Sequence, residues 1–371
     1  MAIGFYNFQR LHDEEFQKAV MGRFSEIVSK NAFVEGEYNT KFETQFAKMQ
    51  NAKHCDLVAN GTDALEIALQ AYGVGKGDKV AISAISFYAT AECVYNVGAE
   101  PVFVDVIPET GLICPDSLER VLADHPEVKA VICVHIYGMA ADVAALKKIC
   151  EPKGIKIVED GAQAAGGFYT DGSPIGSSGN LVTYSFYPTK NLGAFGDAGA
   201  ILCNDDALSE EIKSIRNHGR SPDGHKLIGR NSRCDHLQAA VLELKLSTCE
   251  AQNENRKNIA AWYFEELKGT AGVELVPESY VKTSSWHLYP IRLETKEKKY
   301  ALKEFLASKN IGSALFYEKA MPEEKPLLNL PGEKEKAVTF AHKTICLPMH
   351  PFLTREDVKT VADAVREFLN S

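Results

Sequence analysis

One lysine lies in a stretch of sequence whose composition favours chemistry over solvation. Lys190 is surrounded by aromatic and small residues, and no other charged residue occurs between Gly172 and Lys190. Burial lowers the pKa of a lysine, and the neutral amine is a nucleophile toward carbonyl carbons. A structural lysine more often lies on a solvated face among charged neighbours. We therefore predict a reactive amine at Lys190, with the small residues after it leaving room for a flat ligand.

A carboxylate and an anion site accompany this lysine. Asp160 directly follows the apolar run 155–159, a position where α/β sheets present ligand-binding groups. Asn60-Gly61-Thr62 follows another apolar run and opens a predicted helix, whose free N–H groups and dipole favour an anion. Taken alone, Asp160 fits a helix N-cap equally well, and the Gly-Thr turn fits an ordinary capped helix.

Taken together, the three features match the requirements of pyridoxal phosphate. This cofactor needs an amine for a Schiff base, a carboxylate against its pyridine nitrogen and a site for its phosphate. The carboxylate keeps the ring nitrogen protonated, and a charge-assisted hydrogen bond of this kind contributes about 1.5–3 kcal/mol. The sequence therefore predicts a pyridoxal phosphate site built from Lys190, Asp160 and the start of the helix at Gly61.

Six motifs spread over nearly the whole chain share one pattern. They are Asn60-Gly61-Thr62-Asp63-Ala64-Leu65, Val134-His135-Ile136-Tyr137-Gly138, Glu159-Asp160-Gly161-Ala162-Gln163-Ala164, Ser185-Phe186-Tyr187-Pro188-Thr189-Lys190-Asn191-Leu192-Gly193, Gly229-Arg230-Asn231-Ser232-Arg233-Cys234-Asp235 and Leu347-Pro348-Met349-His350-Pro351. They resemble the nucleotide-sugar aminotransferases of the DegT–StrS family, which have the aspartate-aminotransferase-like fold. The resemblance implies L-glutamate as amino donor, a nucleotide-linked keto-hexose as acceptor and pyridoxamine phosphate as the intermediate form of the cofactor.

The resemblance also assigns roles around the cofactor ring. Lys190 matches the lysine that forms the Schiff base and moves the proton, and Asp160 matches the partner of the pyridine nitrogen. Gln163 matches a glutamine near the ring hydroxyl, and Phe87 matches the aromatic residue that stacks on the ring. Some relatives carry histidine in place of the lysine and perform a dehydration. The presence of Lys190 therefore favours transamination.

Four residues match ligands of the cofactor phosphate in the family. Gly61, Thr62 and Ser185 match ligands from the same chain. Asn231 matches an asparagine that reaches the phosphate from the neighbouring subunit. The resemblance therefore implies a homodimer with active sites at the interface.

Resemblance to subgroups of the family indicates which carbon of the sugar is aminated. Residues 231–240 resemble the members that aminate C3 of a 3-keto sugar, whereas C4-aminating members tend to carry tyrosine after the asparagine. We expect a product that feeds a surface polysaccharide or a glycosylated metabolite. The alternatives are an enzyme acting at C4 or on a keto-cyclitol, and a regulatory protein that binds the cofactor without turnover.

Three residues are predicted substrate contacts. Tyr187 either touches a substrate phosphate or packs beside Lys190. Tyr317 keeps the tyrosine of a family His-Tyr-Pro motif in the small domain, but here the stretch reads Phe316-Tyr317-Glu318, which leaves the identity of the sugar open.

Arg230 is the third predicted substrate contact. The sequence allows two roles for Arg230 and for its neighbour Arg233. Both arginines offset the diphosphate of the substrate, or both pair with Asp235 and Glu243.

Seven short apolar runs supply the framework for these residues. They cover residues 55–59, 79–83, 101–105, 129–135, 155–159, 181–186 and 198–203. Most are separated by potential helices, a pattern typical of a buried parallel sheet. We predict an α/β fold with a mostly parallel sheet of about seven strands flanked by helices, and at least one antiparallel strand within residues 168–205.

Helical patterns flank this region on both sides. Residues 13–29 and the segment after 36 predict two helices, and residues 235–268 predict a long one. Beyond it, a strand at 286–293 and helices at 297–308 and 354–369 indicate a smaller α+β domain. We place the boundary near residue 250, giving a large cofactor-binding domain of residues 1–250 and a small domain of residues 251–371.

Composition excludes several other classes of protein. The 371 residues carry 41 Lys and Arg against 50 Asp and Glu, a net charge of −9, which argues against nucleic-acid binding. No apolar run reaches the roughly 18 residues of a membrane span, and the N-terminus lacks the basic region of a signal peptide. The nine cysteines include no Cys-x-x-Cys pair, and no metal-ligand spacing is present. We expect a cytoplasmic protein without a metal site.

Overall fold

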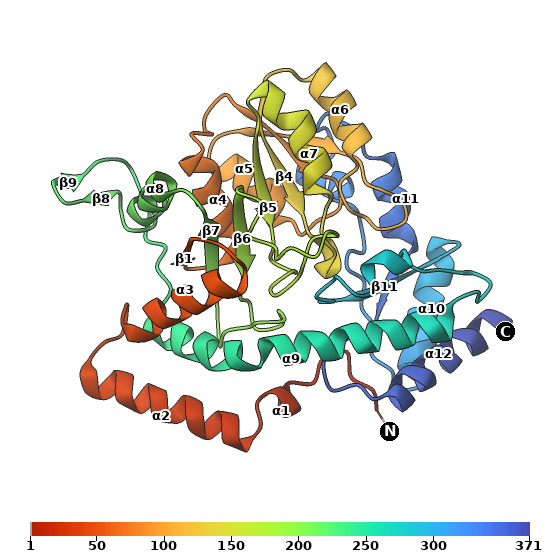
Figure 1. Cartoon of the computed structure of the whole chain (residues 1–371). Helices are drawn as coiled ribbons and strands as arrows, with labels where there is room; N and C mark the ends of the chain where they lie inside the picture. The colour runs from red at the N-terminus through yellow and green to blue at the C-terminus, as the bar shows by residue number, and fades with distance from the viewer. Residues whose placement is uncertain (1) are drawn as a thin grey trace.

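A seven-stranded sheet forms the centre of the molecule. The computed structural model describes residues 2–371, and the sheet has the order β1-β7-β6-β5-β4-β2-β3 (Figure 1). Its strands are β1 (His54–Val58), β2 (Lys79–Ser83), β3 (Glu100–Val104), β4 (Val128–Val134), β5 (Lys156–Asp160), β6 (Leu181–Ser185) and β7 (Gly199–Cys203). Only β7 runs antiparallel to its neighbours, β1 and β6. The predicted fold class is confirmed, and β7 is the predicted antiparallel strand.

Burial on both faces explains why these strands are continuously apolar. The central residues Val80, Ala81 and Ile82 of β2 have no exposed surface. Helices flank the sheet (Figure 1), among them α4 (Gly61–Ala71), α5 (Ala89–Asn96), α6 (Pro115–Asp124), α7 (Val143–Cys150) and α8 (Asp206–Arg216). Strand ends differ from the predicted runs by one residue at most positions. In β5 this difference matters, because the strand itself ends at Asp160.

The N-terminal helices pack beside one long helix. They are α1 (Phe8–Leu11), α2 (Glu14–Lys30) and α3 (Glu37–Met49), and the long helix is α9 (His236–Leu267). Figure 1 shows α2 and α3 lying along the N-terminal half of α9, and both contact it. The predicted break after α2 is confirmed, because the helix ends at Lys30 and the next residue, Asn31, is in a left-handed conformation with φ of 53°.

A second, smaller sheet follows α9. It contains β10 (Val273–Glu274), β11 (Tyr289–Leu293) and β12 (Thr344–Leu347), and its helices are α10 (Lys296–Ser308), α11 (Glu335–Lys343) and α12 (Arg355–Asn370). The predicted strand at 286–293 begins only at Tyr289, because Trp286 has a φ of 47°, outside the β region. The proposed domain boundary near residue 250 falls inside α9 and stays a prediction.

Two further features bear on the predicted class of protein. All nine cysteines are free thiols, and eight of them are buried. Within residues 2–371, no helix is both long enough and apolar enough to cross a lipid bilayer.

Candidate active site

The sheet topology brings the predicted cofactor residues to one edge. Asp160 ends β5, and Lys190 lies in the connection between β6 and β7. Gly61 opens α4 directly after β1, which is paired to β7. Because β7 is antiparallel to β1 and β6, its start lies at the same sheet edge as their ends. The prediction that these residues meet at the carboxyl edge of the parallel strands is therefore consistent with the topology.

The start of α4 forms a cradle that suits a phosphate. A Cβ atom on Gly61 would lie 2.6 Å from the Cβ of Ser185, so only glycine allows this close approach. The Asn60 side chain caps the helix by accepting from the N–H of Asp63 at 2.8 Å. The N–H groups of Gly61 and Thr62 have no backbone acceptor within the described chain. Together with the helix dipole, they present positive partial charge toward an anion.

Lys190 and Asp160 are two titratable groups at this sheet edge, and each affects the charge of the other. Burial lowers the pKa of Lys190 to about 8, and the charge of Asp160 partly opposes this shift. Burial also raises the pKa of Asp160, which is only 7% exposed. Its Oδ1 accepts from the N–H of Ala162 at 3.0 Å, whereas Oδ2 has no donor among residues 2–371. This free carboxylate oxygen suits a protonated pyridine nitrogen, which would offset the cost of burial.

Gln163 joins the sheet edge to the small domain. Its Oε1 accepts from the backbone N–H of Tyr137 at 2.7 Å, and its Nε2 donates to the hydroxyl of Tyr317 at 3.1 Å. Burial, together with the nearby charge of Asp160, raises the pKa of Tyr317 and keeps its hydroxyl protonated. Sequence reasoning proposed Gln163 and Tyr317 for different ligands. The structure places their side chains in contact.

Two exposed aromatic side chains belong to the predicted site. Phe87, between β2 and α5, is 60% exposed, and Tyr187, in the Lys190 loop, is 52% exposed. Their predicted roles, stacking on the cofactor ring and contact with a substrate phosphate, stay predictions.

Arg230 is engaged with α4. Its guanidinium pairs with Glu66, which is 5% exposed, and lies 3.5 Å from a carboxylate oxygen of Asp63. It also donates to Gln70 at 3.3 Å. This pairing differs from the sequence alternative of Asp235 and Glu243. It leaves the proposed contact with a substrate diphosphate as a prediction.

Arg233 is also committed elsewhere. It donates to the side-chain oxygen of Asn217 at 2.7 Å, and Glu243 pairs with Arg23 instead. The sequence alternative was therefore wrong about the partners of this arginine.

Asn231 is exposed and lies between two anchored residues. Arg230 holds to α4, and the hydroxyl of Ser232 accepts from the N–H of Ala59 at 3.1 Å. Asn231 thus belongs to a segment fixed near the start of α4. Its predicted role toward a neighbouring subunit stays a prediction.

Sequence reasoning missed a buried network on the residue next to Asp160. Glu159 has no exposed surface and accepts from His135 at 3.0 Å, Tyr169 at 2.7 Å and Asn180 at 2.7 Å. These hydrogen bonds hold the pKa of Glu159 below its usual value despite burial. The available signal was an acidic residue inside an otherwise apolar strand.

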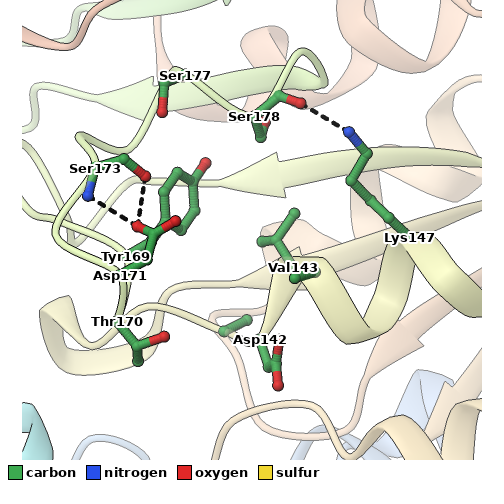
Figure 2. A pocket seen from close by; sticks show the side chains of 11 residues that line it. Asp142, Val143, Lys147, Tyr169, Thr170, Asp171, Ser173, Ser177 and Ser178 are labelled. Carbon is green, nitrogen blue, oxygen red and sulfur yellow. Dashed lines mark hydrogen bonds between the residues drawn. The ribbon is translucent and has the colours of Figure 1, made fainter.

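A pocket of about 260 Å³ lies against this network (Figure 2). Tyr169 and Ser178, which both donate to Glu159, line it together with Asp142 and Lys147 of the α7 region. None of the residues predicted to bind cofactor or substrate lines this pocket. It is therefore separate from the candidate active site.

A second pocket, of about 230 Å³, includes Tyr317. It is lined by Ser86, Tyr317, Glu318, Lys319, Met321 and Glu324. Because Tyr317 contacts Gln163, this pocket adjoins the cofactor residues. The pocket lies between Ser86, which follows β2, and the small-domain loop that contains Phe316-Tyr317-Glu318 in place of the family His-Tyr-Pro motif.

Comparison with known proteins finds relatives that match nearly the whole chain. The chain is 37% identical over 361 residues to a pleiotropic regulatory protein of Geobacillus stearothermophilus, covering 96% of this chain and 95% of that protein. It is 35% identical to the UDP-2-acetamido-2-deoxy-3-oxo-D-glucuronate aminotransferase of Pseudomonas aeruginosa, with 91% and 93% covered. It is 33% identical to the dTDP-3-amino-3,4,6-trideoxy-alpha-D-glucose transaminase of Streptomyces venezuelae, with 96% and 93% covered.

Solved structures share the fold over the full length. S. venezuelae DesV in complex with a ketimine intermediate has a TM-score of 0.94 and 32% identity, with 100% of this chain and 99% of DesV covered. NtdA of Bacillus subtilis with bound PMP has a TM-score of 0.91 and 26% identity, with 100% and 86% covered. A sequence model of one family matches residues 13–366. The chain belongs to the DegT/DnrJ/EryC1/StrS aminotransferase family, whose cofactor is pyridoxal phosphate.

Proposed function

We propose that this protein transfers the amino group of L-glutamate to C3 of a nucleotide-linked 3-keto-hexose. The observation that carries the proposal is that Lys190, whose pKa is lowered to about 8, and Asp160 lie at the same sheet edge as the linked side chains of Gln163 and Tyr317. Two of the relatives compared above are named for a 3-amino or a 3-oxo sugar. The product would feed a surface polysaccharide or a glycosylated metabolite.

Four side chains would hold and activate the cofactor. Pyridoxal phosphate, when bound, supplies an electron sink that stabilises negative charge on the substrate carbon. Lys190, with a pKa of about 8, holds a useful fraction of neutral amine near neutral pH and can accept or return a proton. Asp160 would hold the pyridine nitrogen through its free Oδ2. Gln163 would lie near the ring hydroxyl, and Tyr317 holds Gln163 in place.

The other predicted ligands are assigned by position. Gly61, Thr62 and Ser185 would bind the cofactor phosphate at the start of α4, and Phe87 would cover the ring. The pocket beside Tyr317 would receive part of the sugar nucleotide. Tyr187 would contact a substrate phosphate from its exposed position.

A homodimer in the cytoplasm completes the proposal. Asn231 would reach the cofactor phosphate of the neighbouring subunit. Four large apolar side chains of α2 and the turn after it are exposed, namely Met21 (64%), Val28 (60%), Phe33 (47%) and Val34 (47%). Exposed apolar groups of this kind favour a protein–protein interface.

Product analysis tests the position of amination. The purified protein, loaded with pyridoxal phosphate, is incubated with L-glutamate and a nucleotide-linked 3-keto or 4-keto hexose, and the products are identified by NMR. We expect an amino group at C3 from the 3-keto substrate, and no product with Lys190→Ala. Amination only of the 4-keto substrate, or only of a keto-cyclitol, would replace the C3 assignment.

The name of the Geobacillus relative favours a second candidate, a regulatory protein without turnover. Lys190, Asp160 and Gln163 are all present here, and a protein that only binds the cofactor has no need of all three. Failure of L-glutamate to convert the bound cofactor would support the regulatory alternative.

A further inference from the structure

Three polar side chains of α9 contact the loop that carries Lys190. They lie seven and eight residues apart, which places them two turns apart on one face of the helix. The contacts join Gln238 Oε1 to the N–H of Phe195 at 2.9 Å, Lys245 Nζ to the carbonyl of Gly193 at 2.7 Å, and Asn253 Oδ1 to Nδ2 of Asn191 at 3.1 Å. The loop is thus fastened to α9 at three points.

Asn191, the residue directly after Lys190, uses both polar atoms of its side chain in hydrogen bonds, which reach beyond α9 to Ser285 and His287. It is only 9% exposed, and its Nδ2 also donates to the carbonyl of Ser285 at 2.7 Å. Its Oδ1 lies 3.3 Å from Nδ1 of His287. Burial lowers the pKa of His287 well below its usual value. Because an amide oxygen can only accept, Nδ1 of His287 is the donor in this contact. The backbone next to Lys190 is therefore held from three sides.

Asn253 and Ser285, which both contact Asn191, also hold the loop after Asp160. Asn253 Nδ2 donates to the carbonyl of Ala165 at 2.9 Å, and the Ser285 hydroxyl donates to the carbonyl of Gln163 at 3.2 Å. A Cβ atom on Gly166 would lie 2.4 Å from Asn253 Nδ2, so the helix and this loop are in close contact. One amide of α9 thus bridges the two loops that carry the cofactor residues.

We propose that Asn253 is a positioning residue that sets Lys190 relative to Asp160 and Gln163. It acts through Asn191 on one side and the Ala165 carbonyl on the other, and it touches neither cofactor nor substrate. Truncation of a buried amide leaves its hydrogen-bond partners unsatisfied. Removal of Asn253 would therefore loosen the loop after Lys190 and the loop after Asp160 relative to each other. The inference rests on the proposed cofactor roles of Lys190 and Gln163, but not on the identity of the sugar.

A matched pair of variants separates positioning from ordinary stability. Asn253→Ala removes its hydrogen bonds to Asn191 and to the carbonyl of Ala165, and also its long contact of 3.9 Å with Sγ of Cys249 in the same helix. Asn39→Ala, in α3, serves as the control, because Asn39 is 7% exposed and also makes two hydrogen bonds, donating to the carbonyl of Cys234 at 2.8 Å and accepting from the N–H of Gly36 at 3.0 Å. For each, we would measure the thermal midpoint and the dissociation constant of pyridoxal phosphate from the full-length protein.

We expect similar losses in thermal midpoint, but a rise of at least about tenfold in the cofactor dissociation constant for Asn253→Ala only. Competitive acetylation, read by mass spectrometry, should also show the pKa of Lys190 rising from about 8, because a loosened loop admits water to the amine. Equal dissociation constants in both variants, or an unchanged pKa of Lys190, would overturn the proposal.

Asn191→Ala provides the second test and keeps α9 intact. Since Asn191 and Asn253 act through a shared contact, the double variant should weaken cofactor binding by less than the product of the two single effects. If the double variant weakens cofactor binding by the full product of the two single effects, Asn191 and Asn253 act independently and the proposal is wrong. If Asn253→Ala does not fold, comparing Asn191→Ala with Asn39→Ala decides the same question. Normal cofactor binding without sugar amination would contradict the proposed function and leave this inference intact.

Discussion

The reactivity of Lys190 follows from two opposing influences on one amine. Burial lowers its pKa to about 8, and Asp160 favours the charged ammonium form. Lys245 shows the effect of burial without a carboxylate partner, since burial alone lowers its pKa to about 8 as well. A carboxylate beside Lys190 therefore does not restore an ordinary lysine.

A pH profile tests this balance. We expect the rate at which cofactor-free protein captures pyridoxal phosphate to rise with pH and level off above about 8, because only the neutral amine attacks. Asp160→Asn removes the charge that favours ammonium, so the profile should move to lower pH. Stopped-flow absorbance measures both rates. A shift of the variant profile to higher pH would contradict the assignment.

Arg230 has two candidate roles that a double variant can separate. Arg230→Met leaves the buried Glu66 unpaired and should lower the free energy of unfolding by about 3 kcal/mol. Adding Glu66→Gln removes the unpaired charge and should restore most of that loss, as measured by urea unfolding. If Arg230 also binds the substrate diphosphate, KM stays raised in the double variant. A KM that returns to the wild-type value assigns Arg230 to α4 alone.

At the scale of elements, the start of α4 depends on a glycine. Gly61→Ala would place a Cβ atom 2.6 Å from that of Ser185, so the helix start must shift away from the phosphate site. We expect the dissociation constant of pyridoxal phosphate to rise at least about tenfold, by fluorescence titration. Gly22→Ala in α2 is the control, because its Cβ atom meets nothing within 4 Å. Unchanged affinity in Gly61→Ala would rule out this cradle as the phosphate site.

The elements were predictable because burial on both faces leaves a direct mark on the sequence. Each apolar run became a strand, and the sheet edge that presents Asp160 and Lys190 followed from the topology. The long helix α9 was predicted over 235–268 and spans His236–Leu267.

The contacts between elements were not predictable in the same way. Asn253 and Asn191 are 62 residues apart, and Gln163 and Tyr317 are 154 apart. Periodicity identifies the buried face of a helix but not the side chain that it meets. Arg230 illustrates this limit, since its type and position fit several partners, and the fold brought it to Glu66.

At the scale of the whole molecule, shared active sites make a prediction about mixed dimers. Lys190→Ala and Asn231→Ala should each be impaired, the first completely. If Asn231 serves the neighbouring subunit, a mixed dimer contains one site with both residues intact. Subunit exchange between equal amounts of the two variants should then yield about a quarter of wild-type activity. If Asn231 serves its own subunit, mixing restores nothing, and the activity equals the average of the two variants.

The central claim is that Lys190 and its neighbours perform an amino transfer from L-glutamate. The most direct measurement is the visible absorption spectrum of the protein loaded with pyridoxal phosphate, before and after adding L-glutamate, with Lys190→Ala alongside. We predict a yellow protein that bleaches with L-glutamate, and a variant that does not cycle. A protein that stays colourless when supplied with pyridoxal phosphate would contradict the cofactor site and every role built on it.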